Sequence, residues 1–217
     1  MVSSDTARLG IIRRARAPNI PPIIRYKDAR GPICAYLSDP IRNMNPLITG
    51  INTFQQRSVD PAETPLRQDD ARQSIAVLEA VQGLSNQLGQ YAFLQAPQSQ
   101  PKLVLGGVEV SIRMDLFVHG TSRGQDQFGG AVLRMTQDDA DTDAARARRQ
   151  AMGQFVATLV RRHAESVVPA DRTPANRLCL AIDIQHGEVF PAPASSTRRM
   201  NDLEAACRMI AAMWDTA

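Results

Sequence analysis

The residues best suited to chemistry in this chain lie on one segment of alternating polarity, VEVSIRMDLFV, at residues 108–118. Glu109, Arg113 and Asp115 are its charged positions, and side chains two residues apart on a β-strand share a face. Carboxylates gathered on one face are oxygen ligands of the kind that divalent metal ions take. The same pattern is typical of the solvent side of an amphipathic strand, so the spacing leaves a metal site and a plain surface open.

Acidic residues occur in two other places. Asp183 is the one charged residue of the apolar segment 178–184, where it is either structural or the polar group that faces a site. Residues 137–143 carry four aspartates, which favour a helix N-terminus with a solvated face. A two-metal site is less favoured there because these carboxylates are close in sequence instead of coming from separate elements. Histidine and cysteine show no metal-ligand spacing, which argues against a structural zinc site.

Positive charge is small overall and locally clustered. The formal net charge is +3, and nearly all of the basic residues are arginine, so the overall charge says little about a polyanionic partner. One cluster lies on the expected helix 144–165 and consists of Arg146, Arg149, Arg161 and Arg162. A second cluster lies ahead of the first expected core helix and consists of Arg13, Arg14, Arg16, Arg25, Lys27 and Arg30. Either cluster could contact nucleic-acid phosphate or form an ordinary solvated face.

The elements that must position these residues change character along the chain. Apolar spacings of three and four predict helices over 26–37, 41–54 and 68–88, separated by a polar loop at 55–67. The second half predicts strands over 102–105, 108–118 and 128–135, with a hairpin connection at 119–127. A long helix at 144–165, a buried strand at 178–184 and a last helix at 199–214 follow.

This order predicts an α/β fold: a mixed central sheet of about four to five strands flanked by helices, with a mainly helical N-terminal region. Length favours one well-buried domain. We therefore expect a basic N-terminal arm at 1–22 and a single α/β domain at 23–217, in which residues 23–67 form a helical subregion.

The run helix, β, β, β, helix, β over about residues 68–191 resembles the core of the PD-(D/E)XK nucleases, and Asp115 lies where that family has an acid at the end of the second core strand. The resemblance implies that Asp115 is a catalytic metal ligand and that Glu79, in SIAVLEAV, is the glutamate many members carry on the preceding helix. It also implies Mg²⁺ or Mn²⁺ as the cofactor of an active enzyme. Gln150 is similar to a glutamine that recombination-type members carry near DNA, with Arg146 and Arg149 beside it as phosphate contacts.

The next strand departs from that family. An acid-x-lysine pair is required there, but FGGAVLRMTQ offers Arg134 as its only charged residue. Arginine stays protonated and is a poor replacement for a lysine that orients the attacking water. The resemblance therefore implies either an inactive copy or a site that has migrated to Glu109, Arg113 and Asp115.

Three functions follow as hypotheses. The first is a nuclease-like, nucleic-acid-associated protein with weak or absent metal-dependent phosphodiester cleavage. The alternative is a non-catalytic interaction subunit of a larger complex, such as a phage-defence or mobile-element complex, with a protein partner or a second copy of itself. The third is an unrelated small-molecule enzyme on a mixed sheet. The three cysteines are widely spaced in apolar surroundings, which is typical of reduced thiols in a cytoplasmic protein. The sequence also lacks an apolar run that could span a bilayer, so we expect no membrane contact.

Overall fold

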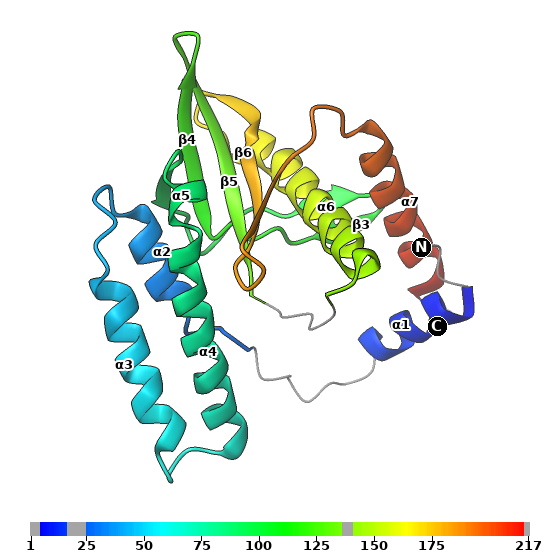
Figure 1. The fold of residues 1–217 in the computed structure, drawn as a ribbon. Coiled ribbons are helices and arrows are strands. Elements are labelled where there is room, and N and C mark those ends of the chain that lie inside the picture. The colour runs from blue at the N-terminus through cyan, green and yellow to red at the C-terminus, as the bar shows by residue number, and fades with distance from the viewer. Residues whose placement is uncertain (1–4, 17–24, 136–140, 215–217) are drawn as a thin grey trace. The chain divides into compact units, whose positions relative to one another are not determined.

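The computed structural model describes residues 5–16, 25–135 and 141–214 (Figure 1). The chain groups into two compact units. Unit 1 comprises Met1–Ile24, Lys102–Ser111 and Ser195–Ala217, and unit 2 comprises Arg25–Pro101 and Ile112–Ala194. This grouping differs from the expected arm and single domain, because a hairpin and the last helix group with the N-terminal helix.

Unit 2 is built on a mixed sheet whose strands follow one another in space. The strands are β1 (Ala92–Gln95), β4 (Leu116–Ser122), β5 (Gln125–Arg134), β6 (Thr173–Asp183) and β7 (Glu188–Pro191), in that order across the sheet. All neighbours are antiparallel except β5 and β6, which are parallel and joined by the crossover helix α6 (Asp143–Val167). The predicted α/β class with a mixed sheet of about five strands is confirmed.

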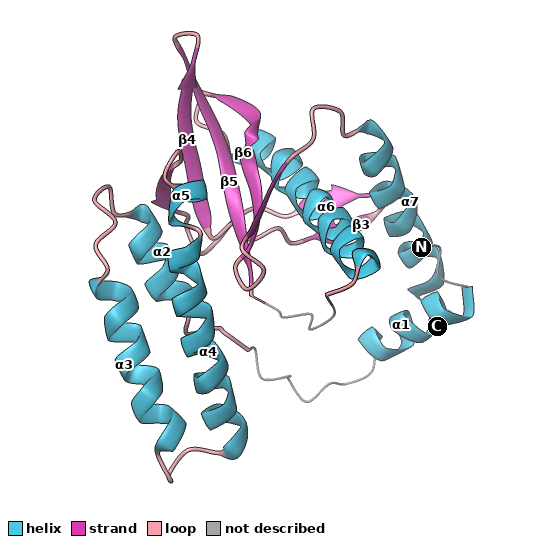
Figure 2. Cartoon of the chain, viewed as in Figure 1, coloured by secondary structure: helices cyan, strands magenta, loops and turns pink. Residues whose placement is uncertain are grey.

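Four helices precede the sheet in unit 2 (Figure 2): α2 (Arg30–Ser38), α3 (Asn45–Val59), α4 (Pro65–Gly83) and the short α5 (Ser85–Leu88). The predicted loop at 55–67 is too long. Polar residues extend α3 to Val59, and α4 begins at Pro65, where the Thr64 side chain accepts a hydrogen bond from the Arg67 N–H. Proline suits a first helical turn because its missing N–H is not needed there.

The prediction of one strand over 108–118 is wrong, because this segment forms two separate strands. Residues Val108–Val110 form β3, which pairs only with β2 (Leu103–Leu105) across a turn at Gly106 and Gly107. These strands belong to unit 1, and the chain enters β4 of unit 2 only at Leu116. Alternating polarity fits one long strand or two short ones equally well. The predicted hairpin connection is too long as well: β4 and β5 continue to a two-residue turn at Arg123 and Gly124.

The core of unit 2 lies between the sheet and the helices α2, α3 and α4. Fully buried residues from both layers meet there, including Leu47, Leu78, Leu116, Leu133 and Ile182. On β5, Ala131 and Leu133 belong to that core, so Val132 between them faces the other side, where α6 contacts the sheet. The close approach of α6 requires Gly153, whose Cβ would lie 2.2 Å from the Phe190 ring.

Unit 1 contains α1 (Asp5–Arg16), the β2–β3 hairpin and α7 (Thr197–Trp214). Helix α7 contacts both α1 and the hairpin. At Gly106, φ is +53° and a Cβ would lie 2.7 Å from the Glu204 carbonyl oxygen, so only glycine fits this approach. Within the described ranges, no helix is both long enough and apolar enough to cross a bilayer.

Candidate functional site

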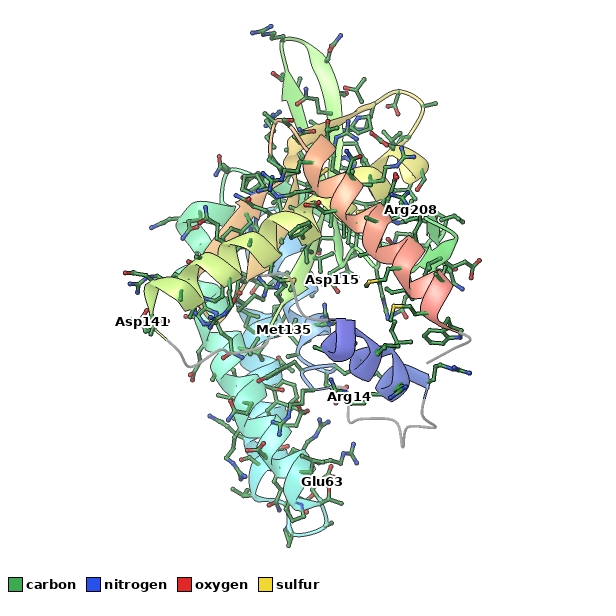
Figure 3. The ribbon with its side chains drawn as sticks, turned by 90° about the vertical axis from the view of Figure 1, so that its right-hand side faces the viewer. Arg14, Glu63, Asp115, Met135, Asp141 and Arg208 are labelled. Carbon is green, nitrogen blue, oxygen red and sulfur yellow. The ribbon has the colours of Figure 1, made fainter. Side chains whose placement is uncertain are left out.

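Asp115 lies immediately before β4 and is held by three sets of contacts (Figure 3). Its backbone N–H donates to the Ala131 carbonyl at 2.8 Å. Arg30 Nη1 is 2.7 Å from both of its carboxylate oxygens, and the Leu133 N–H donates to Oδ2 at 2.8 Å. The Asp115 side chain is 7% exposed, while that of Arg30 is 41% exposed. Asp115 therefore joins α2 to the start of β4 and to the C-terminal part of β5.

The surroundings of Asp115 do not fit a divalent metal ion. Such an ion needs several oxygen ligands, and a second carboxylate is the usual source of compensating charge. Within the described ranges, no three His, Cys, Asp or Glu side chains come together as a metal-binding group. The adjacent stretch of β5 supplies apolar Val132 and Leu133, and Arg30 brings a positive charge to the carboxylate instead. We therefore derive no reaction step through a metal here.

Cys34 is the thiol beside this contact, with Sγ at 3.8 Å from the Asp115 carbonyl oxygen. Burial, and secondly the Asp115 charge, raises the pKa of the Cys34 thiol to about 12. A thiol that stays protonated is a poor nucleophile and a poor metal ligand. Cys34 thus adds packing and no reactive group.

Arg134 belongs to a different cluster, at the carboxyl ends of the parallel strands β5 and β6. It is the register partner of Asp183, and its Nη1 lies 3.1 Å from Asp183 Oδ2. Asp183 is 1% exposed, and its Oδ1 lies 2.9 Å from His186 Nδ1. Arg149, 8% exposed on α6, has Nε at 3.9 Å from a carboxylate oxygen of Glu188. The cluster holds buried charges of both signs in the place where open α/β sheets commonly bind ligands.

The structure thus assigns the predicted residues Asp115 and Arg134 to separate ion pairs. The single strand expected to carry Glu109, Arg113 and Asp115 on one face does not form, because Glu109 lies on β3 of unit 1 and Asp115 precedes β4 of unit 2. On β3, Glu109 accepts a 2.7 Å hydrogen bond from Lys102, which lowers the pKa of Glu109. Arg113, in the other unit, donates to Gln98.

The other predicted site residues lie on helices. Glu79 is on the exposed side of α4, whose buried face carries Val77 and Leu78. Gln150 is exposed on α6, and Arg146 near the start of α6 pairs with Asp141 and Asp143. Glu79 and Gln150 are therefore outside both charged clusters.

Sequence reasoning missed His186 and Glu188 as members of the Arg134 cluster. A usable signal was present: Asp183 and His186 are three residues apart, directly after a buried strand. A turn at that point brings the two side chains together, and Gly187, with φ of +66°, completes it.

A cavity of about 430 Å³ lies elsewhere in unit 2, beside the edge strand β1. Its walls include Leu37, Asp39, Arg42, Phe93 and His119. Arg42 donates Nη2 to the carbonyl oxygens of Leu88 and Tyr91, each at 3.2 Å, so it ties the α2–α3 turn to the start of β1. Burial lowers the pKa of His119, which favours its neutral form.

Comparisons of this chain with protein-family models, curated proteins and solved structures found no match.

Proposed function

We propose that this chain is a nuclease-like, nucleic-acid-binding protein that does not cleave by a metal-dependent route. The observation that carries the proposal is the Asp115 contact. An acidic residue stands at the head of the second strand of the unit 2 sheet, and an arginine holds both of its oxygens.

The order of elements in unit 2 supports the nuclease-like part. Helix α4, strands β1, β4 and β5, helix α6 and strand β6 occur in this order in unit 2, and their strands are neighbours in one sheet. That is the run on which the resemblance rests, although its first strand is β1 instead of residues 102–105. The short α5 lies between α4 and β1, and β2 and β3 of unit 1 lie between β1 and β4.

The charges around the sheet support the non-cleaving part. Arg30 gives Asp115 a counter-ion of fixed positive charge, so the carboxylate has less need of a metal ion. On β5, Arg134 stands where a lysine would orient water, and it is already held by Asp183. A guanidinium does not give up its proton at neutral pH and cannot manage the proton of an attacking water.

Fluorescence anisotropy with labelled single- and double-stranded DNA and RNA tests the binding part of this proposal. We expect binding that weakens as salt rises, because phosphate contacts release counter-ions. Asp115→Asn should bind as the wild type does, since the contact is internal to the fold. The absence of salt-sensitive binding to any of the probes at low salt would remove the proposal.

The interaction-subunit alternative gains some support from large apolar side chains that both units expose. Most apolar residues of the segment 44–51 are used by the unit 2 core, where Leu47 is fully buried and Met44 and Ile51 pack beside it. Ile48 in the same segment of unit 2 is 50% exposed, and unit 1 exposes Val104 and Trp214. Light scattering after size-exclusion chromatography separates the cases: a dimer that Trp214→Ser converts to a monomer supports the alternative, and a monomeric wild type opposes self-association.

A further inference from the structure

Most arginines of α6 are poorly placed to contact nucleic acid. Three of its five arginines are paired with acids of the same helix or of the residues just before it: Arg146 with Asp141 and Asp143, and Arg161 and Arg162 with Glu165. Arg148 is exposed and forms no ion pair with a residue that the structure describes. Arg149 is 8% exposed and faces the sheet beside Glu188. A phosphate would have to displace a carboxylate at each of the paired positions, which reduces the gain from binding.

Helix α1 carries exposed arginines in its last turn, and two of them differ from the paired arginines of α6. Its last turn carries Arg13, Arg14 and Arg16, and all three side chains are exposed. Neither Arg13 nor Arg14 forms an ion pair with any residue that the structure describes. Asp5, the only acid in the α1 sequence, is its first residue and thus at the other end of the helix. Figure 3 shows Arg14 on this helix.

The net positive charge of the chain is also concentrated in unit 1. In unit 1, arginine and lysine outnumber aspartate and glutamate, whereas the two kinds of charge balance in unit 2. The excess positive charge of the protein therefore belongs to unit 1. Such a field attracts a polyanion toward the unit that carries it.

The apolar residues of α1 favour a nucleic acid over a membrane surface. Ile12 is 5% exposed, buried in the unit where α1 contacts α7, and Ile11 is the helix's one large apolar side chain that is strongly exposed among those described. A helix that lies in a bilayer interface needs a broad apolar face in addition to its basic one. The α1 surface offers charge with little apolar area to insert.

We propose that the exposed arginines in the last turn of α1, here called the α1 arginine surface (Arg13, Arg14 and Arg16), form the phosphate-contacting surface of the protein, with a nucleic-acid backbone as the partner. This inference rests on the proposed function and relocates its binding surface from α6 to unit 1. Recognition is by charge and is independent of base sequence, because contacts to phosphate carry no sequence information.

Cations at a helix C-terminus also have a structural use, because they interact favourably with the helix dipole. Substitution of these arginines distinguishes the structural role from the proposed phosphate-binding role. A purely structural role predicts reduced helix stability and unchanged affinity for nucleic acid. The proposed role predicts a change in affinity and in its salt dependence.

The test compares variants by anisotropy on the same DNA and RNA probes over a salt series, after circular dichroism has shown that each variant is folded. In the α1 variant (Arg13→Ala, Arg14→Ala, Arg16→Ala), we expect the slope of log K against log salt to fall by about 0.9 for each duplex phosphate that the protein no longer neutralises. Replacing the same three residues with lysine should restore most of the slope, because lysine still supplies a charge to each phosphate. Arg67→Ala, Arg72→Ala, Arg162→Ala removes equal charge from exposed positions of unit 2 and should leave the slope close to that of the wild type.

Each outcome decides the matter. A wild type that binds, with an α1 alanine variant of unchanged slope, overturns this inference and leaves the proposed function standing. A larger drop in slope for the unit 2 control than for the α1 variant also overturns it. A wild type that binds no nucleic acid removes both proposals, and if that protein binds vesicles of phosphatidylserine and phosphatidylcholine through the α1 arginine surface, the partner is a membrane.

Discussion

Replacing Asp115 with alanine should destabilise unit 2, because its carboxylate anchors two parts of the fold. The substitution removes the acceptor of the Leu133 N–H and the counter-ion of Arg30. A buried N–H left without a partner costs about 1–3 kcal/mol. Because Arg30 is 41% exposed, the ion pair adds only about 0.5 kcal/mol after solvent screening. We expect the free energy of unfolding to fall by about 2–3 kcal/mol.

Urea unfolding followed by far-ultraviolet circular dichroism measures this change. The single tryptophan, Trp214, lies in unit 1, so its fluorescence follows the unfolding of that unit. Asp115→Asn keeps an oxygen that accepts from Leu133 and should cost about 1 kcal/mol, less than the alanine variant. A carboxylate retained for catalysis would behave in the opposite way, since replacing such groups often leaves stability unchanged or raises it. An alanine variant within about 0.5 kcal/mol of the wild type would therefore refute the structural role.

Three further predictions concern buried or closely packed residues of unit 2. Burial lowers the pKa of His163, so its imidazole binds a proton less readily in the folded protein than in the unfolded chain, where it is protonated near pH 6.5. Unfolding free energy should therefore fall as pH drops below about 6.5, and His163→Gln should flatten that part of the urea-midpoint profile. Gly153→Ala should cost about 1–3 kcal/mol because its Cβ would meet the Phe190 ring, whereas Gly83→Ala, with open space around it, should be neutral or raise thermal stability slightly. Cys34, whose pKa is raised to about 12, should react with Ellman's reagent at neutral pH much more slowly in the folded protein than in urea.

The fold class was predictable because the long periodic segments reflect burial directly. The apolar spacing that predicted a helix at 144–165 corresponds to α6, and the apolar run at 178–184 corresponds to the buried half of β6. Strand β1 was missed because it has four residues, of which only Phe93 is buried. The break between β3 and β4 was missed for another reason. Alternating polarity indicates which side chains are buried, but it does not indicate which unit they are buried in.

The candidate site was only partly predictable, because ion pairs join residues that are distant in sequence. Asp115 was expected at the end of the second core strand, whereas it lies just before the start of β4. Its partner Arg30 lies 85 residues away and appeared only as one of several basic residues near the N-terminus. Arg134 was identified as the charged residue of its strand. Its pairing with Asp183 follows from the parallel register of β5 and β6, which local patterns do not determine.

The most direct test of the central claim is whether purified protein cuts labelled DNA or RNA in the presence of Mn²⁺ or Mg²⁺. The proposed function predicts that the probes are bound, and the arrangement of Arg30, Asp115 and Arg134 predicts that they remain full-length on a denaturing gel. Metal-dependent cutting that Asp115→Asn abolishes would contradict the claim, because it would show that Asp115 serves as a metal ligand despite its contact with Arg30.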